Sequence, residues 1–125
     1  MMIAEKSNEG RGALTEAEAE YLAENFLGRV ATSSLSNQPH VVPVAYKFDG
    51  SDIYFGGRNL KGSLKYRNLV GNNKVAFVVD EVVSASPWRV RGVEVRGVAE
   101  PVQSEDGLPL VKIRPLAVRS WGLER

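Results

Sequence analysis

Alternation of hydrophobic and polar residues dominates the chain, and helical spacing is confined to two short segments. The first segment opens with Thr15 and Glu18, a capping-box pair that satisfies the free amide groups at a helix start. Gly28 supplies a stop signal, because glycine commonly ends helices. We therefore predict a helix over Glu16–Phe26. Apolar residues at helical spacing form its expected buried stripe: Tyr21, Leu22, Phe26 and Leu27.

Strand patterns follow the first helix. Turn signals separate them at Ser36-Asn37 and at Asp49-Gly50, a strong hairpin pair. Pro43 predicts an unpaired amide position or a bulge, and Pro115 predicts an interruption of the last strand. The segments predicted as strands are Arg29–Leu35, His40–Phe48, Asp52–Gly56, Lys74–Asp80, Gly92–Val102 and Leu110–Trp121.

The segment Lys74–Asp80 is nearly continuously apolar, which predicts a mid-sheet strand buried on both faces. In Gly92–Val102 the residues Val93, Val95 and Gly97 face opposite to the charged positions between them. A connection carrying Pro87 and Trp88 joins these two strands.

A second helix is predicted over Ser63–Val70, with Gly71-Asn72 as its stop. Six modest strands joined mainly by hairpins, with only two short helices, predict a mainly β protein built as a small antiparallel barrel. The polar residues 1–12 have nothing to bury and are expected to be a flexible N-terminal segment, which leaves residues 13–125 as one domain.

Composition narrows the function classes. With 43% hydrophobic and 25% charged residues, the chain of 125 residues is typical of a single soluble globular domain. A net charge of +1 provides no global field toward nucleic acid or an anionic membrane. The chain has no cysteine, which excludes disulfides and thiolate sites and agrees with a cytoplasmic location. No apolar run approaches the length of a membrane helix.

The most informative stretch for chemistry is Gly56–Arg67, where a strand ends in two glycines and leads through basic residues into a helix. Free amides and the positive end of the helix dipole attract phosphate there, and Lys or Arg supplies compensating charge. Lys61 and Lys65 would share a helix face if the helix begins early. The alternative is a solvated basic surface. The spacings of a Walker lysine or a dinucleotide-binding glycine motif are absent.

Other candidate sites are weaker. His40 is the only histidine, and without cysteine it cannot found a metal site, so no metal is expected. No nucleophile elbow accompanies it for a serine triad. Trp88 and Trp121 lie beside arginines, where each could stack on a planar ligand or simply pack.

Taken in order, these segments resemble the pyridoxamine 5'-phosphate oxidase-like FMN-binding split-barrel family. The C-terminal part is similar to the branch of deazaflavin (coenzyme F420)-dependent enzymes. The resemblance covers Thr15 to Leu123, almost the whole chain. The segments that carry it are Gly28-Arg29-Val30-Ala31-Thr32, Gln38-Pro39-His40-Val41-Val42-Pro43-Val44, Lys65-Tyr66-Arg67-Asn68-Leu69, Asn72-Asn73-Lys74-Val75-Ala76, Trp88-Arg89-Val90-Arg91-Gly92-Val93-Glu94-Val95-Arg96-Gly97 and Ser120-Trp121-Gly122-Leu123.

The resemblance implies a six-stranded antiparallel split barrel that forms a homodimer, with two cofactor sites in the cleft between subunits. By position, Lys65 matches the lysine that grips the cofactor phosphate. The strand Val41–Val44 matches the one whose backbone faces the edge of the flavin-like ring. The full set of cofactor-binding residues that the resemblance implies is Thr32, Val41, Val42, Pro43, Val44, Gly57, Arg58, Lys61, Ser63, Lys65, Trp88, Arg91 and Trp121, the last three approaching from the partner subunit.

Two departures from the family pattern matter. Many relatives carry arginine where this chain has Ser63, so Arg58 or Lys61 is expected to take over that role. The chain also ends in Gly122-Leu123-Glu124-Arg125, without the arginine–histidine segment of true pyridoxamine 5'-phosphate oxidases, so oxidation of vitamin B6 is not expected.

The expected function is therefore that of an oxidoreductase that transfers hydride between coenzyme F420, or alternatively FMN, and a small organic substrate. Because the cofactor carries the reactive chemistry, such an enzyme does not need an obvious catalytic acid or base in its sequence. A second hypothesis is a non-enzymatic protein that carries or senses the cofactor. A third is a nucleic-acid-binding barrel that uses Arg89, Arg91, Arg96 and the tryptophans, which the low net charge disfavours.

Overall fold

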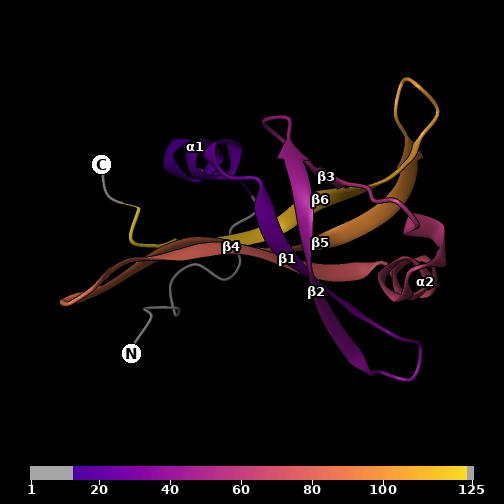
Figure 1. Ribbon diagram of the computed structural model, residues 1–125, viewed down its shortest axis with the longest axis horizontal. Helices are drawn as coiled ribbons and strands as arrows, with labels where there is room; N and C mark the ends of the chain where they lie inside the picture. The colour runs from indigo at the N-terminus through magenta and orange to yellow at the C-terminus, as the bar shows by residue number, and fades with distance from the viewer. Residues whose placement is uncertain (1–12, 124–125) are drawn as a thin grey trace.

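The computed structural model describes residues 13–123, so the N-terminal segment predicted to be flexible lies outside the described residues. Two α-helices, one 3₁₀ helix and six strands make up this part of the chain (Figure 1). In chain order they are α1 (Glu16–Glu24), β1 (Leu27–Ser33), β2 (Pro39–Phe48), β3 (Ile53–Phe55), η1 (Leu60–Gly62), α2 (Leu64–Gly71), β4 (Lys74–Ala85), β5 (Trp88–Gln103) and β6 (Pro109–Trp121).

The six strands form a closed antiparallel barrel in the order β1-β2-β3-β6-β5-β4, which confirms the predicted fold class. Figure 1 shows α1 and α2 at different ends of the barrel, and the hairpin of β4 and β5 extends beyond it. Trp88 is the first residue of β5, although the sequence predicted that it lies in the connection between the two strands. Within residues 13–123 no helix is long and apolar enough to cross a bilayer.

The barrel interior is filled by every second residue of each strand. In β4 the residues Val75, Phe77 and Val79 are buried, whereas Ala76 and Val78 between them are only partly covered. The prediction that this strand is buried on both faces was therefore wrong. Its outward side chains are apolar but lie on an open face of the sheet, and a continuous apolar run cannot be distinguished from burial on both faces by pattern alone.

The first helix is held by its N-terminal cap. Thr15 and Glu18 form the predicted capping box, with Glu18 Oε1 accepting from the Thr15 amide at 2.9 Å. Glu18 is also buried, and its second oxygen accepts a hydrogen bond from the Ser120 hydroxyl at 2.6 Å. One carboxylate therefore both starts α1 and fixes it against β6.

The end of the first helix differs from the prediction. α1 ends at Glu24, and Gly28 lies inside β1 instead of terminating the helix. Phe26 and Leu27 are 75% and 55% exposed, so only Tyr21 and Leu22 of the expected stripe are buried. The apolar residues 26–27 suit the helix pattern and the strand pattern equally. Pairing of Leu27 with Ala45 of β2 places Leu27 in the strand, whereas Phe26 lies in the link between α1 and β1.

Gly28 is required for packing and not for its backbone freedom. A Cβ atom at this position would overlap the buried ring of Phe77 and lie 2.9 Å from Cε1 and Cε2. The same ring packs edge-on against Tyr46, with 5.1 Å between ring centroids. Absence of a side chain at residue 28 therefore lets β4 place its largest side chain under β1.

The last two strands are joined irregularly at one point. β6 carries an extra residue opposite the register shift between Arg96 and Gly97, beside Pro115. The carbonyl of Arg114 approaches Gly97 so closely that a Cβ there would overlap it. Pro115 therefore interrupts regular pairing as predicted, and the irregularity lies beside Leu116, which is 47% exposed.

Gly28→Ala is expected to lower the free energy of unfolding by about 1–3 kcal/mol, because the added methyl overpacks the Phe77 site. Urea denaturation measures this change. Gly71→Ala is the matched control, since its nearest neighbour would be Leu35 Cγ at 3.4 Å and no loss is expected. Equal stability of both variants would contradict the close contact.

Two buried tyrosines make stability depend on alkaline pH. Burial raises the pKa of Tyr21 to about 12, and burial also raises the pKa of Tyr46 above its usual value of 10.0. The hydroxyl of Tyr46 donates to the Leu22 carbonyl at 2.7 Å. Because the unfolded chain releases these protons first, stability is complete below pH 10 and falls as the pH rises toward the folded-state values.

Tyr46→Phe removes one of these two titrating groups. We expect a loss of about 0.5–1.5 kcal/mol at neutral pH from the missing hydrogen bond. We also expect a smaller fall in stability between about pH 9 and about pH 11 than in the unmodified protein. Denaturant titrations across this range measure both effects, and an unchanged alkaline slope would show that Tyr46 does not contribute.

Candidate functional site

One edge of β2 lacks a neighbouring strand. The amide of Tyr46 donates to the Phe26 carbonyl at 3.1 Å, on the β1 side. Backbone groups alternate in direction along a strand, so those of Val41, Pro43 and Ala45 point to the other side. On that side, β3 pairs only with Tyr46–Phe48 of β2. No strand within residues 13–123 pairs with the remaining part of this β2 edge. We call the backbone groups of Val41, Pro43 and Ala45 the open edge.

Pro43 lies on this open edge, where its missing N–H removes no ladder hydrogen bond. The first of the two predicted alternatives, an unpaired amide position, is therefore confirmed. The edge offers N–H groups from Val41 and Ala45 and carbonyl groups from all three residues. A ligand with alternating donors and acceptors could bind along it.

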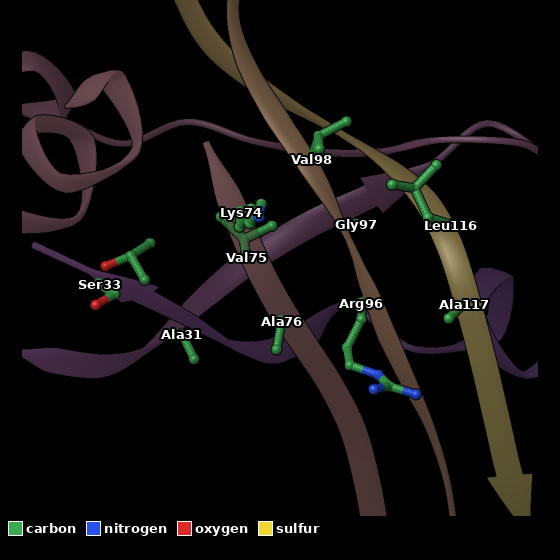
Figure 2. A pocket seen from close by; sticks show the side chains of 11 residues that line it. Ala31, Ser33, Lys74, Val75, Ala76, Arg96, Gly97, Val98, Leu116 and Ala117 are labelled. Atoms are coloured by element: carbon green, nitrogen blue, oxygen red, sulfur yellow. The ribbon is translucent and has the colours of Figure 1, made fainter. Parts of the chain in front are cut away.

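The outer face of the sheet beside this edge is hollowed. A smaller hollow of about 260 Å³ is bounded by Val41, Ala31, Ala76 and Trp121. A larger hollow of about 490 Å³ continues across β1, β4, β5 and β6 and shares Ala31 and Ala76 with it. Figure 2 shows Ala31, Ala76 and Ala117 of the larger hollow, with Leu116 and Val98 beside them. We call the two hollows together the outer trough.

Charged side chains on this face are mostly paired. Arg29 lies 3.2 Å from Asp80, and Arg119 lies 3.0 Å from Glu94. Trp121 closes one end, and its ring lies so near Gly92 that a Cβ there would be 2.7 Å from Cζ2. The smaller hollow is thus an apolar surface bordered by paired charges, which suits a planar ring system.

The start of α2 has the features of an anion site. Ser63 is its N-cap, with the hydroxyl accepting from the Tyr66 amide at 3.3 Å and donating to the Leu60 carbonyl at 2.6 Å. The amides of Leu64 and Lys65 have no partner within the helix. They lie at the helix start, where the helix dipole favours negative charge. Gly57, with φ of +147°, is the second residue of the loop between β3 and η1, in which Arg58 is exposed.

Lys61 and Lys65 do not share a helix face, because α2 begins only at Leu64 and the early helix start that a shared face requires is not observed. Lys61 belongs to η1 and lines a separate hollow of about 350 Å³ with Tyr66 and Gln103, whereas Lys65 lies in the first turn of α2. The 3₁₀ turn and its own cap separate the two lysines, because Ser63 interrupts the helical spacing.

Thr32 connects α2 to the barrel. Its side chain is buried, and Oγ1 accepts a hydrogen bond from Asn68 Nδ2 at 3.0 Å. The backbone at Thr32 lines the larger hollow. Thr32 thereby fixes the position of α2 relative to the outer trough.

Trp88 and Arg91 lie away from the trough in the single chain. Trp88 is 56% exposed at the turn of the β4–β5 hairpin. The guanidinium of Arg91 lies 5.2 Å from the centroid of Tyr21 and pairs with Glu81, whose hydrogen bond raises the pKa of Arg91. Their predicted approach to a partner's cofactor site therefore stays a prediction.

The other predicted residues divide between the interior and the surface. Val42 and Val44 point into the barrel, where Val44 is 7% exposed. Val41 is 63% exposed and lines the smaller hollow together with Trp121. In the described part of the chain, no three histidine or acidic residues are grouped to hold a metal ion.

Sequence reasoning missed the residues that shape the trough. Ala31, Ala76 and Ala117 matter because they are small, and the sequence gives no periodic signal for small outward side chains. Ala45 was also missed, although the predicted alternation of His40–Phe48 places it two residues after Pro43 on the same edge.

Comparison with known proteins decides the family. The model of the pyridoxamine 5'-phosphate oxidase family matches residues 15–116. The chain belongs to this family. A relative, 5a,11a-dehydrotetracycline/5a,11a-dehydrooxytetracycline reductase of Streptomyces rimosus, is 35% identical over 119 residues, which cover 88% of this chain and 84% of that protein.

Solved structures share the family fold. A conserved hypothetical protein from Mycobacterium tuberculosis superposes with a TM-score of 0.75 at 21% identity, covering 98% of this chain and 91% of its own. A protein described as F420 reductase gives 0.67 at 22% identity, with 85% and 98% covered. An FAD-binding protein from Mycobacterium smegmatis gives 0.66 at 23% identity, with 86% and 95% covered.

Asn68→Ala is expected to lower the free energy of unfolding by about 1–3 kcal/mol, because the buried Thr32 hydroxyl loses its partner. Asn73→Ala, at an exposed position in the following loop, is the control and should change stability little. Thermal or urea unfolding measures both. Equal effects would mean that the Thr32–Asn68 bond does not hold α2.

Proposed function

We propose that this protein is a cytoplasmic oxidoreductase that binds a flavin-type cofactor, coenzyme F420 in preference to FMN, between two copies of the chain. It transfers hydride between the cofactor ring and a small organic substrate. The observation that carries the proposal is the open edge of β2 beside an apolar trough. Val41 contributes to both, since its side chain lines the smaller hollow and its backbone lies on the edge.

The open edge fits the polar rim of a flavin or deazaflavin ring. Such a ring has a pyrimidine edge with carbonyl and N–H groups, which the N–H and carbonyl groups of Val41 and Ala45 can pair with. A ring paired in this way would lie beside β2 on the side that faces away from β1, next to the exposed side chain of Val41. Backbone groups hold these positions without reorganisation, so they can stabilise charge that develops on the ring.

The start of α2 fits the phosphate of such a cofactor. The amides of Leu64 and Lys65 and the Lys65 ammonium would bind phosphate oxygens. Arginine at residue 63, common in relatives, is replaced by a serine whose hydroxyl is already used as a cap, so Arg58 is proposed as the second cation.

A second copy of the chain is proposed to close the cleft. The trough is open on its outer side in the single chain. In a homodimer, Trp88 and Arg91 of the partner subunit are proposed to approach it. The exposed hairpin that carries Trp88 supports this arrangement. Expulsion of water from the cleft would strengthen each electrostatic contact within it.

The reaction class is suggested by the relative that reduces 5a,11a-dehydrotetracycline. We propose addition of two hydrogens across a carbon–carbon double bond conjugated to a carbonyl group. A bound reduced cofactor would provide the hydride, which carries two electrons to one carbon, and water would provide the proton to the other. The chain's own residues orient the reactants, exclude bulk water and bind the ring edge.

Equilibrium binding of coenzyme F420 and FMN, followed in parallel by fluorescence, tests the cofactor assignment. Tight binding of F420 alone supports the proposal, whereas preference for FMN makes the protein an FMN-dependent reductase or oxidase. A solution mass equal to one chain would contradict the shared cleft. If F420 binds but reduces no acceptor faster than free cofactor under anaerobic conditions, the protein is a non-enzymatic carrier.

Lys65→Ala is expected to weaken cofactor binding by about 1.5–3 kcal/mol, the value of a charge-assisted hydrogen bond. Lys47→Ala, on the exposed outer side of β2, is the charge-matched control and should leave the affinity unchanged. A similar loss in both variants would mean that general electrostatics, and not a phosphate site at α2, controls binding.

A further inference from the structure

The hairpin of β4 and β5 ends in exposed apolar side chains. Figure 1 shows this hairpin extending beyond the barrel. At its end, Val82, Val83 and Trp88 are 55%, 49% and 56% exposed. Apolar patches that stay exposed on a folded chain commonly mark a surface of contact with another molecule. We call residues 82–88 the hairpin tip, and its composition indicates such a surface.

The hairpin tip and the larger hollow lie on the same face of β4 and β5. Opposed residues of antiparallel strands point to one face, and residues an even number apart along a strand share that face. Ala76 lies opposite Arg96 in the lining of the larger hollow (Figure 2). Ala85 lies opposite Trp88 at the tip. Arg96 and Trp88 are eight residues apart on β5 (96 − 88 = 8), so both point to this face.

An arrangement with two-fold symmetry brings these two features together. Gly92 lies midway between them on β5, four residues from Arg96 and four from Trp88 (96 − 92 = 4; 92 − 88 = 4). At about 3.3 Å per residue, each feature is roughly 13 Å from Gly92. A two-fold axis that passes over Gly92, across the strands and parallel to the sheet, therefore places the tip of each copy over the hollow of the other.

The hairpin tip cannot enter the hollow of its own chain. Both features are parts of the same two strands and lie roughly 26 Å apart. Only a second copy can therefore bring a tip to the hollow. When each tip enters the hollow of the other copy, the contact is reciprocal and closes as a dimer, whereas a one-sided contact would continue as a fibre.

The charged groups of this face permit its burial. Arg29 pairs with Asp80, and Arg119 pairs with Glu94, within one chain. Arg96 also interacts within the chain. Burial is costly for a charge without a partner, and these charges need no partner from another molecule. An apolar surface can therefore cover this face without leaving these charges unpaired.

We propose that the larger hollow receives the hairpin tip of a second copy of this chain, so that two copies exchange tips about a two-fold axis over Gly92. The inference deepens the proposed function, on which it rests for the homodimer. The partner's Trp88 and the partner's Ala85 cover Ala76 and the apolar lining of the hollow. Lys74, the first residue of β4, is exposed and keeps its ammonium group hydrated at the border of the contact. The larger hollow is accordingly a protein contact and not a ligand pocket.

Cysteine cross-linking tests the contact, because the chain has no cysteine of its own. A variant with both Ala76→Cys and Ala85→Cys carries one thiol in the hollow and one at the tip. The two thiols of one chain are roughly 30 Å apart along β4, so a short bis-maleimide joins only thiols of different chains. We expect most of this variant to become a covalent dimer without any cofactor present.

Two control variants accompany this measurement. Ala85→Cys alone should not cross-link, because the two tips of a reciprocal dimer lie at opposite ends of the contact. Ala23→Cys combined with Ala85→Cys should not cross-link either, since Ala23 is exposed on α1, outside the proposed contact. Cross-linking of the controls to the same extent as the test variant would overturn the proposed arrangement.

Trp88→Ala tests the energetic role of the tip. We expect self-association, measured by sedimentation, to weaken at least about tenfold, as is usual when an aromatic side chain at the centre of an interface is truncated. Leu108→Ala is the matched control, because Leu108 is 61% exposed in the loop between β5 and β6. Equal effects of the two substitutions would overturn the role of the hairpin tip.

The outcomes separate this inference from the proposed function. A solution mass of two chains without cross-links above the controls overturns the exchange of hairpin tips and leaves the homodimer intact. A solution mass of one chain, or one that grows with concentration beyond two chains, also overturns the exchange. Cross-links in a protein that binds neither F420 nor FMN support the exchange and refute the proposed function.

Discussion

The shortness of β3 is the constraint on which the rest of the structure depends. With three residues, it joins β2 to β6 and closes the barrel, yet it covers only the end of β2. Backbone donors and acceptors need partners, so an uncovered strand edge must bind water, another chain or a ligand. Pro43 removes one donor from this edge and makes it a poor template for a further strand. The remaining groups at Val41 and Ala45 are therefore suited to a small polar ligand.

The outer trough is the second consequence of barrel geometry. Gly28 admits the Phe77 ring beneath β1, so the interior takes the bulky side chains while Ala31 and Ala76 face outward. The irregular pairing near Gly97 leaves Leu116 exposed beside the larger hollow. The hollows are therefore an apolar surface, whereas the open edge and the start of α2 supply the polar groups of the proposed cofactor site.

The sequence predicted the barrel because alternation and turn signals depend only on neighbouring residues. Thr15, Glu18 and the stop at Gly71-Asn72 predicted helix ends for the same reason. The predictions failed where partner strands decide, as at Leu27, which belongs to β1, and at Ala76 and Val78, which face outward. The trough could not be predicted, since it is defined by small residues from four strands that are distant in sequence. A helix start after the two glycines was predicted from the sequence, whereas the separation of Lys61 by η1 was not, and phosphate binding at this helix start stays a prediction.

Residue-resolved hydrogen exchange, measured by NMR with and without saturating coenzyme F420, tests the central claim most directly. If the cofactor ring pairs with the open edge, the amides of Val41 and Ala45 exchange more slowly when F420 is bound. The amides of Val42 and Val44, which point toward β1, provide the internal reference and should change little. Saturating F420 that leaves the exchange of Val41 and Ala45 unchanged would place the ring elsewhere and contradict the role assigned to this edge.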